Sequence, residues 1–229
     1  MKFPVPSEVH ELHAGFYLGL LRLRESGLNP DFLLDVGASS GCFSFVAALV
    51  YPKLRYVLVE PLASLYREQK ERYCWLGDLH PEFEFVEVAV SDKRGKVKIN
   101  VATELCSSSL YPLAAADTAK TMEVEALTLD DIDAQKGLQG RGILKLDIQF
   151  AEHLALRGAK RLIRKIDVIL MEVAVERLYK DTMVLSEVVR HMDKAGFRYH
   201  DDLGEYRRPE NDMLCTKDVL FLRKGLLAS

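Results

Sequence analysis

The sequence predicts an α/β fold built around a mostly parallel sheet. Short runs that are apolar throughout, such as "FLLDV" at residues 32–36, are typical of strands buried on both faces. Segments with apolar residues at helical spacing separate these runs, and strands that alternate with helices indicate parallel pairing. The 229 residues contain no internal repeat and no linker-like stretch. We therefore expect a helical segment over residues 1–30, packed on a single domain over residues 31–229.

The first half of the chain predicts helices and strands in alternation, followed by a hairpin. Apolar residues recur at intervals of three and four after Ser7, and Gly27 with Asn29-Pro30 supplies a helix stop. Pro52 ends the next helix, and "SDKRG" at residues 91–95 is typical of a hairpin loop. The predicted elements are helix 7–27, strand 32–36, helix 43–51, strand 55–61, helix 62–73, strand 83–90 and strand 96–102.

The second half predicts three buried strands, the last of them at the end of the domain. Residues 105–120 are small and polar, which predicts a loop or flap. Gly196 is the predicted C-cap of the helix over residues 182–194. The connections 103–121 and 203–216 fit either lids over a cleft or ordinary exposed loops. The predicted elements are strand 122–132, strand 142–148, helix 152–163, strand 167–173, helix 182–194 and strand 218–222.

The charge balance argues against nucleic acid as the main partner. The chain has 31 Lys+Arg against 34 Asp+Glu, a net charge of -3, whereas nucleic-acid binding usually needs a basic surface. A local basic cluster is expected to be a solvated helix end, favoured by the helix dipole. Its members are Lys160, Arg161, Arg164 and Lys165.

The cysteines and the first residues predict a soluble, cytoplasmic protein. Neither a disulfide framework nor a zinc site is expected, because the cysteines are far apart and form no C-x-x-C pair. The start "MKFPVPSEVHELH" lacks the apolar core of a signal peptide, and no run is long enough to span a membrane, so no membrane partner is expected. The cysteines are Cys42, Cys74, Cys106 and Cys215.

The junction "DVGASSG" after the first strand raises the question of a cofactor. Gly37 and Gly41 allow close approach of the backbone, and the following helix offers free N–H groups to an anion. The spacing matches neither the dinucleotide fingerprint nor the phosphate loop. Asp35, two residues before the first glycine, would repel a pyrophosphate and attract an ammonium or sulfonium group. S-adenosylmethionine carries both of these cations.

A second acid strengthens this interpretation. Glu60 ends the next predicted strand, 23 positions after Gly37, and a carboxylate at that strand end can accept hydrogen bonds from both ribose hydroxyls. Ligands of open parallel sheets bind beyond the carboxyl ends of the strands, where both acids are expected. The two acids together favour a cofactor site over a purely structural turn.

At this point the sequence resembles the FkbM-type family of class I S-adenosylmethionine-dependent methyltransferases. The resemblance covers roughly residues 32–223. Its most specific part is "LTLDDI" followed by "ILKLDIQFAEHLALRGA", in which Lys145, Asp147 and Glu152 match the family's signature residues. The other matching stretches are "LLDVGASSGCFS", "VLVEP", "VAVSD", "IDVILMEV" and "DVLFLR".

The resemblance implies a Rossmann-like three-layer αβα sandwich. Its sheet would be mostly parallel with an antiparallel last strand, beside the predicted N-terminal helix and β-hairpin extension. The resemblance also implies methyl transfer, usually to an oxygen. One position departs from the family, because Phe150 stands where the signature usually has glycine. The implied cofactor contacts are Asp35, Gly37, Ser39, Gly41 and Glu60, with Ser91 or Asp92 near the adenine.

Three acids are candidates for catalysis. Asp147, Glu152 and Glu172 lie at or just after strand ends that can converge on one cleft. Neighbouring carboxylates can raise one pKa into the range of a general base, or can hold a divalent cation that activates the acceptor. The alternatives remain open: Glu152 as an acid in the first turn of a helix, and Lys145 as a buried partner of an acid. His153 is either a base or an ordinary surface histidine.

The function that these features favour is O-methylation. We expect a sugar, a glycan or a secondary-metabolite hydroxyl as the acceptor, with S-adenosylmethionine as the donor. The alternatives are an NAD-dependent Rossmann-type enzyme and a non-catalytic cofactor-binding module.

Overall fold

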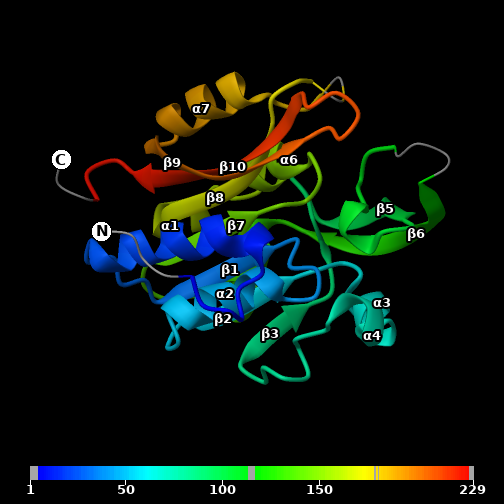
Figure 1. The fold of residues 1–229 in the computed structure, drawn as a ribbon, viewed down its shortest axis with the longest axis horizontal. Coiled ribbons are helices and arrows are strands. Elements are labelled where there is room, and N and C mark those ends of the chain that lie inside the picture. The colour runs from blue at the N-terminus through cyan, green and yellow to red at the C-terminus, as the bar shows by residue number, and fades with distance from the viewer. Residues whose placement is uncertain (1–4, 113–116, 178, 180, 227–229) are drawn as a thin grey trace.

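A seven-stranded sheet forms the centre of the molecule (Figure 1). The structure is a computed structural model that describes residues 5–112, 117–177, 179 and 181–226. The first five strands in spatial order are parallel, and β10 is antiparallel to its neighbours on both sides, which confirms the predicted antiparallel last strand. In spatial order the strands are β3 (Phe83–Val86), β2 (Arg55–Val59), β1 (Phe32–Val36), β7 (Gly142–Leu146), β8 (Ile166–Ala174), β10 (Leu214–Arg223) and β9 (Phe197–Arg207).

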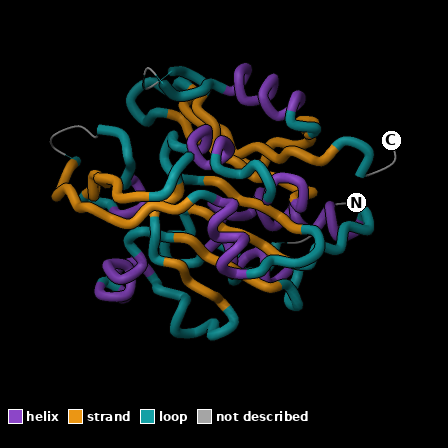
Figure 2. Tube along the Cα trace, turned by 180° about the vertical axis from the view of Figure 1, so that it is seen from behind, coloured by secondary structure: helices purple, strands orange, loops and turns teal. Residues whose placement is uncertain are grey.

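Helices cover both faces of this sheet and give three layers (Figures 1 and 2). Alternate strand residues feed two cores: Leu33 and Ile143 face one layer, and Leu34 and Leu144 face the other. The predicted three-layer α/β fold is therefore confirmed. The first layer contains α1 (Ala14–Glu25) and α2 (Cys42–Val50), and the second contains α5 (Leu129–Lys136), α6 (Glu152–Arg157) and α7 (Leu185–Lys194).

A smaller sheet lies beyond the carboxyl ends of the parallel strands (Figure 1). Its strands are β4 (Ala89–Val90), β6 (Thr118–Leu127) and β5 (Gly95–Ala102), and the antiparallel pair β5–β6 is the predicted hairpin extension. The short helices α3 (Ala63–Glu68) and α4 (Lys70–Tyr73) lie beside it. A third core joins the two parts through Leu62, Tyr66, Trp75, Ile99, Val101 and Leu105.

Two predicted strands are wrong in part. The run 83–90 is split between two sheets: a turn in which the Val88 N–H donates to the Val86 carbonyl separates β3 from β4. The predicted strand 122–132 stops at Leu127, because a helix begins directly after Thr128. The Thr128 hydroxyl accepts from the Asp131 N–H, and the Asp131 carboxylate accepts from the Thr128 N–H, which is a capping box.

Several predicted helices and loops are longer than the observed ones. Helix 7–27 contains a 3₁₀ turn, Glu11–His13, before α1, and helix 62–73 is divided at Gln69. Helix 152–163 ends at Arg157, and a 3₁₀ turn, Leu162–Lys165, follows it. Helix 182–194 begins at Leu185. The loop 203–216 shrinks to residues 208–213, because β9 and β10 extend the final hairpin.

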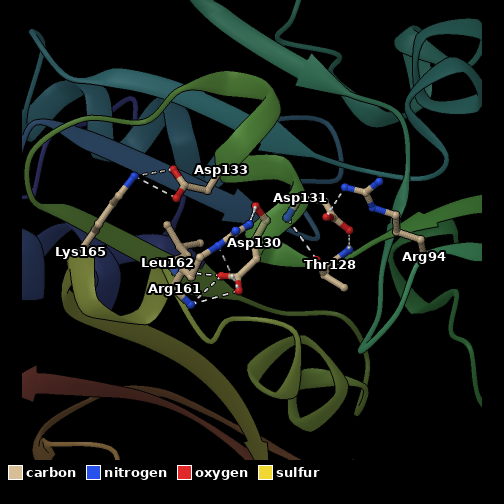
Figure 3. A network of polar contacts seen from close by, with 8 residues as sticks. All are labelled: Arg94, Thr128, Asp130, Asp131, Asp133, Arg161, Leu162 and Lys165. Atoms are coloured by element: carbon tan, nitrogen blue, oxygen red, sulfur yellow. Dashed lines mark hydrogen bonds and ion pairs between the residues drawn. The ribbon is translucent and has the colours of Figure 1, made fainter.

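The basic cluster lies on and just before a 3₁₀ turn, whose backbone is tied to α5 (Figure 3). The Arg161 and Leu162 N–H groups donate to the Asp130 carboxylate, and Lys165 Nζ lies 2.8 Å from Asp133 Oδ1. These contacts join the 3₁₀ turn before β8 to α5. Lys160, Arg161 and Arg164 are exposed, as predicted for a solvated cluster, whereas Lys165 is half-buried and pairs with Asp133.

Two further expectations concern cysteines and membranes. Cys42, Cys74, Cys106 and Cys215 are all free thiols. Among the residues that the structure describes, no helix is long and apolar enough to cross a bilayer.

Candidate active site

A pocket opens where the carboxyl ends of β1, β2 and β7 meet the smaller sheet. Its empty space, including the open mouth, is about 660 Å³. Four predicted site residues line it: Gly37, Ser39, Glu60 and Asp147. The apolar wall includes Val36, Val59, Val88 and Val90, and η2 (Leu105–Ser107) with Ser108, Ser109 and Leu110 covers one side.

The glycine loop, residues 37–41, is built for close contact. Gly37 has φ +78°, and a Cβ atom there would lie 1.8 Å from the carbonyl oxygen of Asp147. A larger residue cannot fit without displacing the backbone of the β7 end. Gly41 has φ +96° and directly precedes α2, but it does not line the pocket. The loop therefore brings two walls of the pocket into contact.

Glu60 anchors the other side of the pocket. One carboxylate oxygen accepts from the Ser39 N–H and the other from the Leu62 N–H, each at 2.9 Å. Burial raises the pKa of Glu60 to about 7, although these two hydrogen bonds act in the opposite direction. Each oxygen has a second lone pair, so a ligand hydroxyl can donate to it as well.

Asp35 lies behind the pocket rather than on its surface. The residue is completely buried, and its Oδ2 accepts from the Ser44 hydroxyl at 2.7 Å. Its Oδ1 lies 3.4 Å from Lys145 Nζ. Asp35 is not among the residues that line the pocket, so the structure gives it no direct contact with the space for a ligand.

Lys145 is a buried partner of two acids, one of the alternatives left open above. Its Nζ lies 3.3 Å from Asp147 Oδ2 in addition to the contact with Asp35, and it donates to the Gly37 carbonyl at 2.8 Å. Burial opposes its charge, but the charges of Asp147 and Asp35 outweigh burial and raise the pKa of Lys145. The ammonium therefore stays charged beneath the pocket.

The three candidate catalytic acids do not share one surface. Asp147 lines the pocket described above, whereas Glu152 and Glu172 line a smaller neighbouring cavity. Glu152 accepts from the Ile148 N–H at 2.9 Å, and burial raises its pKa to about 7. Burial, followed by the charge of Asp147, raises the pKa of Glu172 well above its ordinary value.

Two residues that the sequence did not single out lie beside these acids. Gln149 Nε2 lies 3.4 Å from Asp147 Oδ1 and 3.4 Å from Glu172 Oε2. Asp218 stands opposite Glu172 in the β8–β10 register, and burial raises its pKa to about 6. Gln149 lies within the signature stretch and was therefore visible. Asp218 was not, because its position depends on the antiparallel register.

The arrangement of potential metal-binding side chains does not support a metal-assisted reaction. Among the described residues, no group of three or more His, Cys, Asp or Glu side chains is arranged to hold a metal ion. A divalent cation is therefore not supported as a cofactor.

Phe150 occupies a backbone conformation that favours glycine. Its φ is +76°, and that of Gln149 is +53°. This conformation explains why a glycine suits the position. The ring of Phe150 lines the smaller cavity beside Glu172, and its centroid lies 6.0 Å from that of Tyr179.

The flap, residues 103–112, is attached to the β7–α6 segment and to the β8–α7 connection. The Ser109 hydroxyl donates to the Gln149 carbonyl at 2.8 Å, and the Tyr179 hydroxyl donates to the Pro112 carbonyl at 2.7 Å. The rings of Tyr111 and Tyr179 stack at 4.8 Å. His153 is buried and lies 3.3 Å from the Tyr111 hydroxyl, so it is not a surface histidine. Residues 113–116 of the predicted flap lie outside the described residues.

The two candidates for adenine contact lie next to the pocket but do not line it. Ser91 is buried directly after Val90, which does line the pocket. Asp92 forms an ion pair with Arg157 at 3.2 Å. Their role in cofactor binding stays a prediction.

The sequence of the chain matches that of the methyltransferase FkbM domain over residues 35–199. The chain belongs to this family. The match covers the glycine loop and Glu60. It also covers Asp147, Glu152 and Glu172, but not Asp218. Membership favours the S-adenosylmethionine-dependent methyltransferase interpretation over the NAD-dependent alternative. No curated protein sequence matches the chain.

The chain is similar to several solved structures at low sequence identity. The methyltransferase FkbM from Methylobacillus flagellatus KT is 16% identical with a TM-score of 0.51, and the alignment covers 90% of this chain and 47% of that one. Magnesium protoporphyrin IX methyltransferase from Synechocystis PCC 6803, with bound SAM, is 10% identical with a TM-score of 0.47, over 98% of this chain and 87% of that one. Precorrin-6y C5,15-methyltransferase from Geobacter metallireducens GS-15 is 14% identical with a TM-score of 0.45, over 97% and 93%. The chain thus spans about half of the Methylobacillus protein, which shares its methyltransferase fold.

Proposed function

We propose that this chain transfers a methyl group from S-adenosylmethionine to a hydroxyl oxygen of a sugar, a glycan or a secondary metabolite. The observation that carries the proposal is the pocket in which the glycine loop, Glu60 and Asp147 meet. Membership of the FkbM methyltransferase family supports the reaction class. The choice of oxygen as the acceptor atom rests on the carboxylate of Asp147 in that pocket.

The residues of the pocket fit this donor. Gly37 leaves no room for a side chain, as a backbone cradle for a ligand requires. Glu60 presents carboxylate oxygens that can accept from ribose hydroxyls, and the valines offer an apolar wall for a base. When bound, S-adenosylmethionine supplies a methyl group that its sulfonium already activates. The protein then has to align the acceptor and exclude water.

Asp147 is the residue that we assign to the acceptor. It lies at the end of β7, lines the pocket, and keeps 35% of its side chain exposed. Its carboxylate faces the space for a ligand, so it can accept the proton that the acceptor hydroxyl loses. Glu152 is a less suitable base, because its carboxylate already accepts from the Ile148 N–H at the start of α6.

Calorimetry with S-adenosylmethionine, S-adenosylhomocysteine and NAD tests the binding step. We expect the first two to bind and NAD not to bind. Glu60→Gln should weaken both by about tenfold, because an NH₂ donor replaces one of the two acceptor oxygens. Glu205→Ala is the matched control, since that residue lies on β9 and contacts Arg207. Binding of NAD alone, or unchanged affinity in Glu60→Gln, contradicts the proposed site.

A panel of hydroxylated sugars and metabolites tests the transfer step. With labelled donor, Asp147→Ala should lower turnover by roughly 10²–10⁴-fold, the usual contribution of a general base. Its affinity for S-adenosylhomocysteine should stay within several-fold of the wild type. Turnover at the wild-type rate would remove Asp147 from the mechanism.

A further inference from the structure

Lys145 connects three parts of the site from beneath. Only 6% of the residue is exposed. Its Nζ donates to the Gly37 carbonyl at 2.8 Å, and lies 3.4 Å from Asp35 Oδ1 and 3.3 Å from Asp147 Oδ2. Gly37 belongs to the glycine loop and Asp147 to the opposite wall of the pocket. One ammonium group therefore contacts both walls.

The strand register explains this arrangement. Asp35 on β1 pairs directly with Lys145 on β7 in the parallel ladder, so their side chains leave the sheet on the same face. The ring of Phe43 at the start of α2 lies 5.7 Å from the ammonium and covers it. A buried ammonium is tolerated only when charged or polar groups surround it, and here two carboxylates and a carbonyl do so.

The charges in this cluster depend on one another. Asp35 Oδ1 makes no hydrogen bond among the described residues, so the nearby ammonium is what compensates its charge. Removal of Lys145 leaves two carboxylates close together without a cation. Removal of Asp35 leaves Lys145 paired with Asp147 and still bonded to Gly37. The two substitutions therefore have separable effects.

We propose that Lys145 is a positioning residue for the cofactor: it fixes the Gly37 carbonyl relative to the Asp147 carboxylate and so sets the shape of the pocket between them. This inference rests on the proposed function. The close approach of Gly37 to the Asp147 carbonyl leaves little tolerance, since even a methyl group would overlap there. If the Lys145 contacts are lost, the glycine loop can move away from β7 and the ligand no longer meets both walls.

Four proteins distinguish a positioning role of Lys145 from a purely structural one: the wild type, Lys145→Met, Asp35→Asn, and the double variant. Urea denaturation gives the free energy of unfolding, and calorimetry gives the affinity for S-adenosylhomocysteine, whose uncharged sulfur avoids a direct charge effect. Lys145→Met should be less stable and bind about tenfold more weakly or worse. Asp35→Asn should bind within about threefold of the wild type.

The double variant gives the decisive comparison. It contains no unpaired buried charge from the Asp35–Lys145 pair, so it should recover most of the stability that Lys145→Met loses. Its affinity should nevertheless stay about tenfold below that of Asp35→Asn, because nothing holds the Gly37 carbonyl. Affinity that returns together with stability would show that Lys145 is only structural. Wild-type affinity in Lys145→Met would also overturn the inference.

Lys165 offers a matched control at the other end of the sheet (Figure 3). It too pairs with a carboxylate, Asp133 at 2.8 Å, and donates to a backbone carbonyl, that of Leu138 at 2.8 Å. Lys165→Met should lower stability and leave the affinity for S-adenosylhomocysteine unchanged. A loss of affinity equal to that of Lys145→Met would mean that general destabilisation explains both.

Hydrogen exchange tests the inference even if the proposed function fails. The amides of Gly37 and Ala38 donate to Val59, and that of Gly41 donates to Ala38. In ligand-free Lys145→Met and in the double variant, these amides should exchange about tenfold faster than in Asp35→Asn. Unchanged exchange would overturn the role of Lys145. If the wild type does not bind S-adenosylhomocysteine, the proposed function fails while this result still stands.

Discussion

Phe150 shows how one residue can keep an unfavourable backbone. A non-glycine residue in the left-handed region costs of order 1–3 kcal/mol, and Gln149 next to it also has a positive φ. The sequence resemblance marked this position as one where glycine is usual, and the φ of +76° supplies the physical reason. The side chain lines the cavity beside Glu172.

Two substitutions measure this strain. Phe150→Ala and Phe150→Gly both remove the ring, but only glycine relaxes the backbone. The glycine variant should therefore be more stable than the alanine variant by about 1 kcal/mol in urea denaturation. Cys74, with φ +50°, provides the control, because its glycine and alanine variants should differ in the same direction. Equal stability of the two Phe150 variants would show that no strain is stored there.

Single residues also show where sequence reasoning stops. Gly37 and Glu60 were predictable, because both directly follow buried strands whose ends must meet at one sheet edge. The position of Asp35 was not: the residue is on the right strand, but its side chain points toward Lys145 and away from the pocket. Which face of a strand a side chain takes depends on tertiary packing that a short apolar run does not encode.

Among the elements, α5 was the clearest omission. Apolar and polar residues alternate up to Leu127. Because Leu129 and Ile132 are also apolar, the pattern predicted a strand that continues to residue 132. The capping box at Thr128 was visible but has Asp131 in place of the more typical Glu or Gln. Arg94 binds the same Asp131 carboxylate at 2.5 Å and so ties the β5 side of the molecule to this helix start (Figure 3).

The cap can be tested without touching the pocket. Thr128→Ala removes the hydroxyl that accepts from the Asp131 N–H, and should lower the free energy of unfolding by about 1 kcal/mol. Thr128→Ser keeps the hydroxyl and should retain most of the stability. Affinity for S-adenosylhomocysteine should not change in either variant. If alanine and serine are equally stable, the cap contributes nothing measurable.

At the scale of the whole molecule, the alternation of elements was enough to predict the α/β class and its layers. It could not predict that the chain leaves the large sheet after β3 to build the smaller one, because residues 83–90 form one uninterrupted strand-like run in the sequence. We also propose that the described residues before β1 form one folding unit with the rest: α1 packs against α2 and β9, and Leu20 and Leu23 are fully part of that core.

Buried acids should make the stability of the molecule depend on pH. The pKa of Glu152 is raised to about 7 in the folded state, so its contribution is present at low pH and is lost as the pH rises through about 7. Histidines with lowered pKa, such as His153, act in the opposite direction, so a single variant has to be compared with the wild type.

Glu152→Gln isolates this contribution. The amide can still accept from the Ile148 N–H but does not titrate. Relative to the wild type, the variant should gain on the order of 1 kcal/mol or more between about pH 5 and about pH 8, measured by urea denaturation at each pH. A constant difference across this range would contradict the raised pKa.

The spatial order β8–β10–β9 has a consequence for synthesis on the ribosome. β9 is made before β10, yet in the described structure β10 is its sole neighbour in the sheet. Until residues 214–223 leave the exit tunnel, the nascent β9 has no strand to pair with. The Thr216 hydroxyl cannot yet donate to the Glu172 carboxylate. We therefore expect β9 to pair, and the Thr216–Glu172 hydrogen bond to form, only after residues 214–223 have emerged.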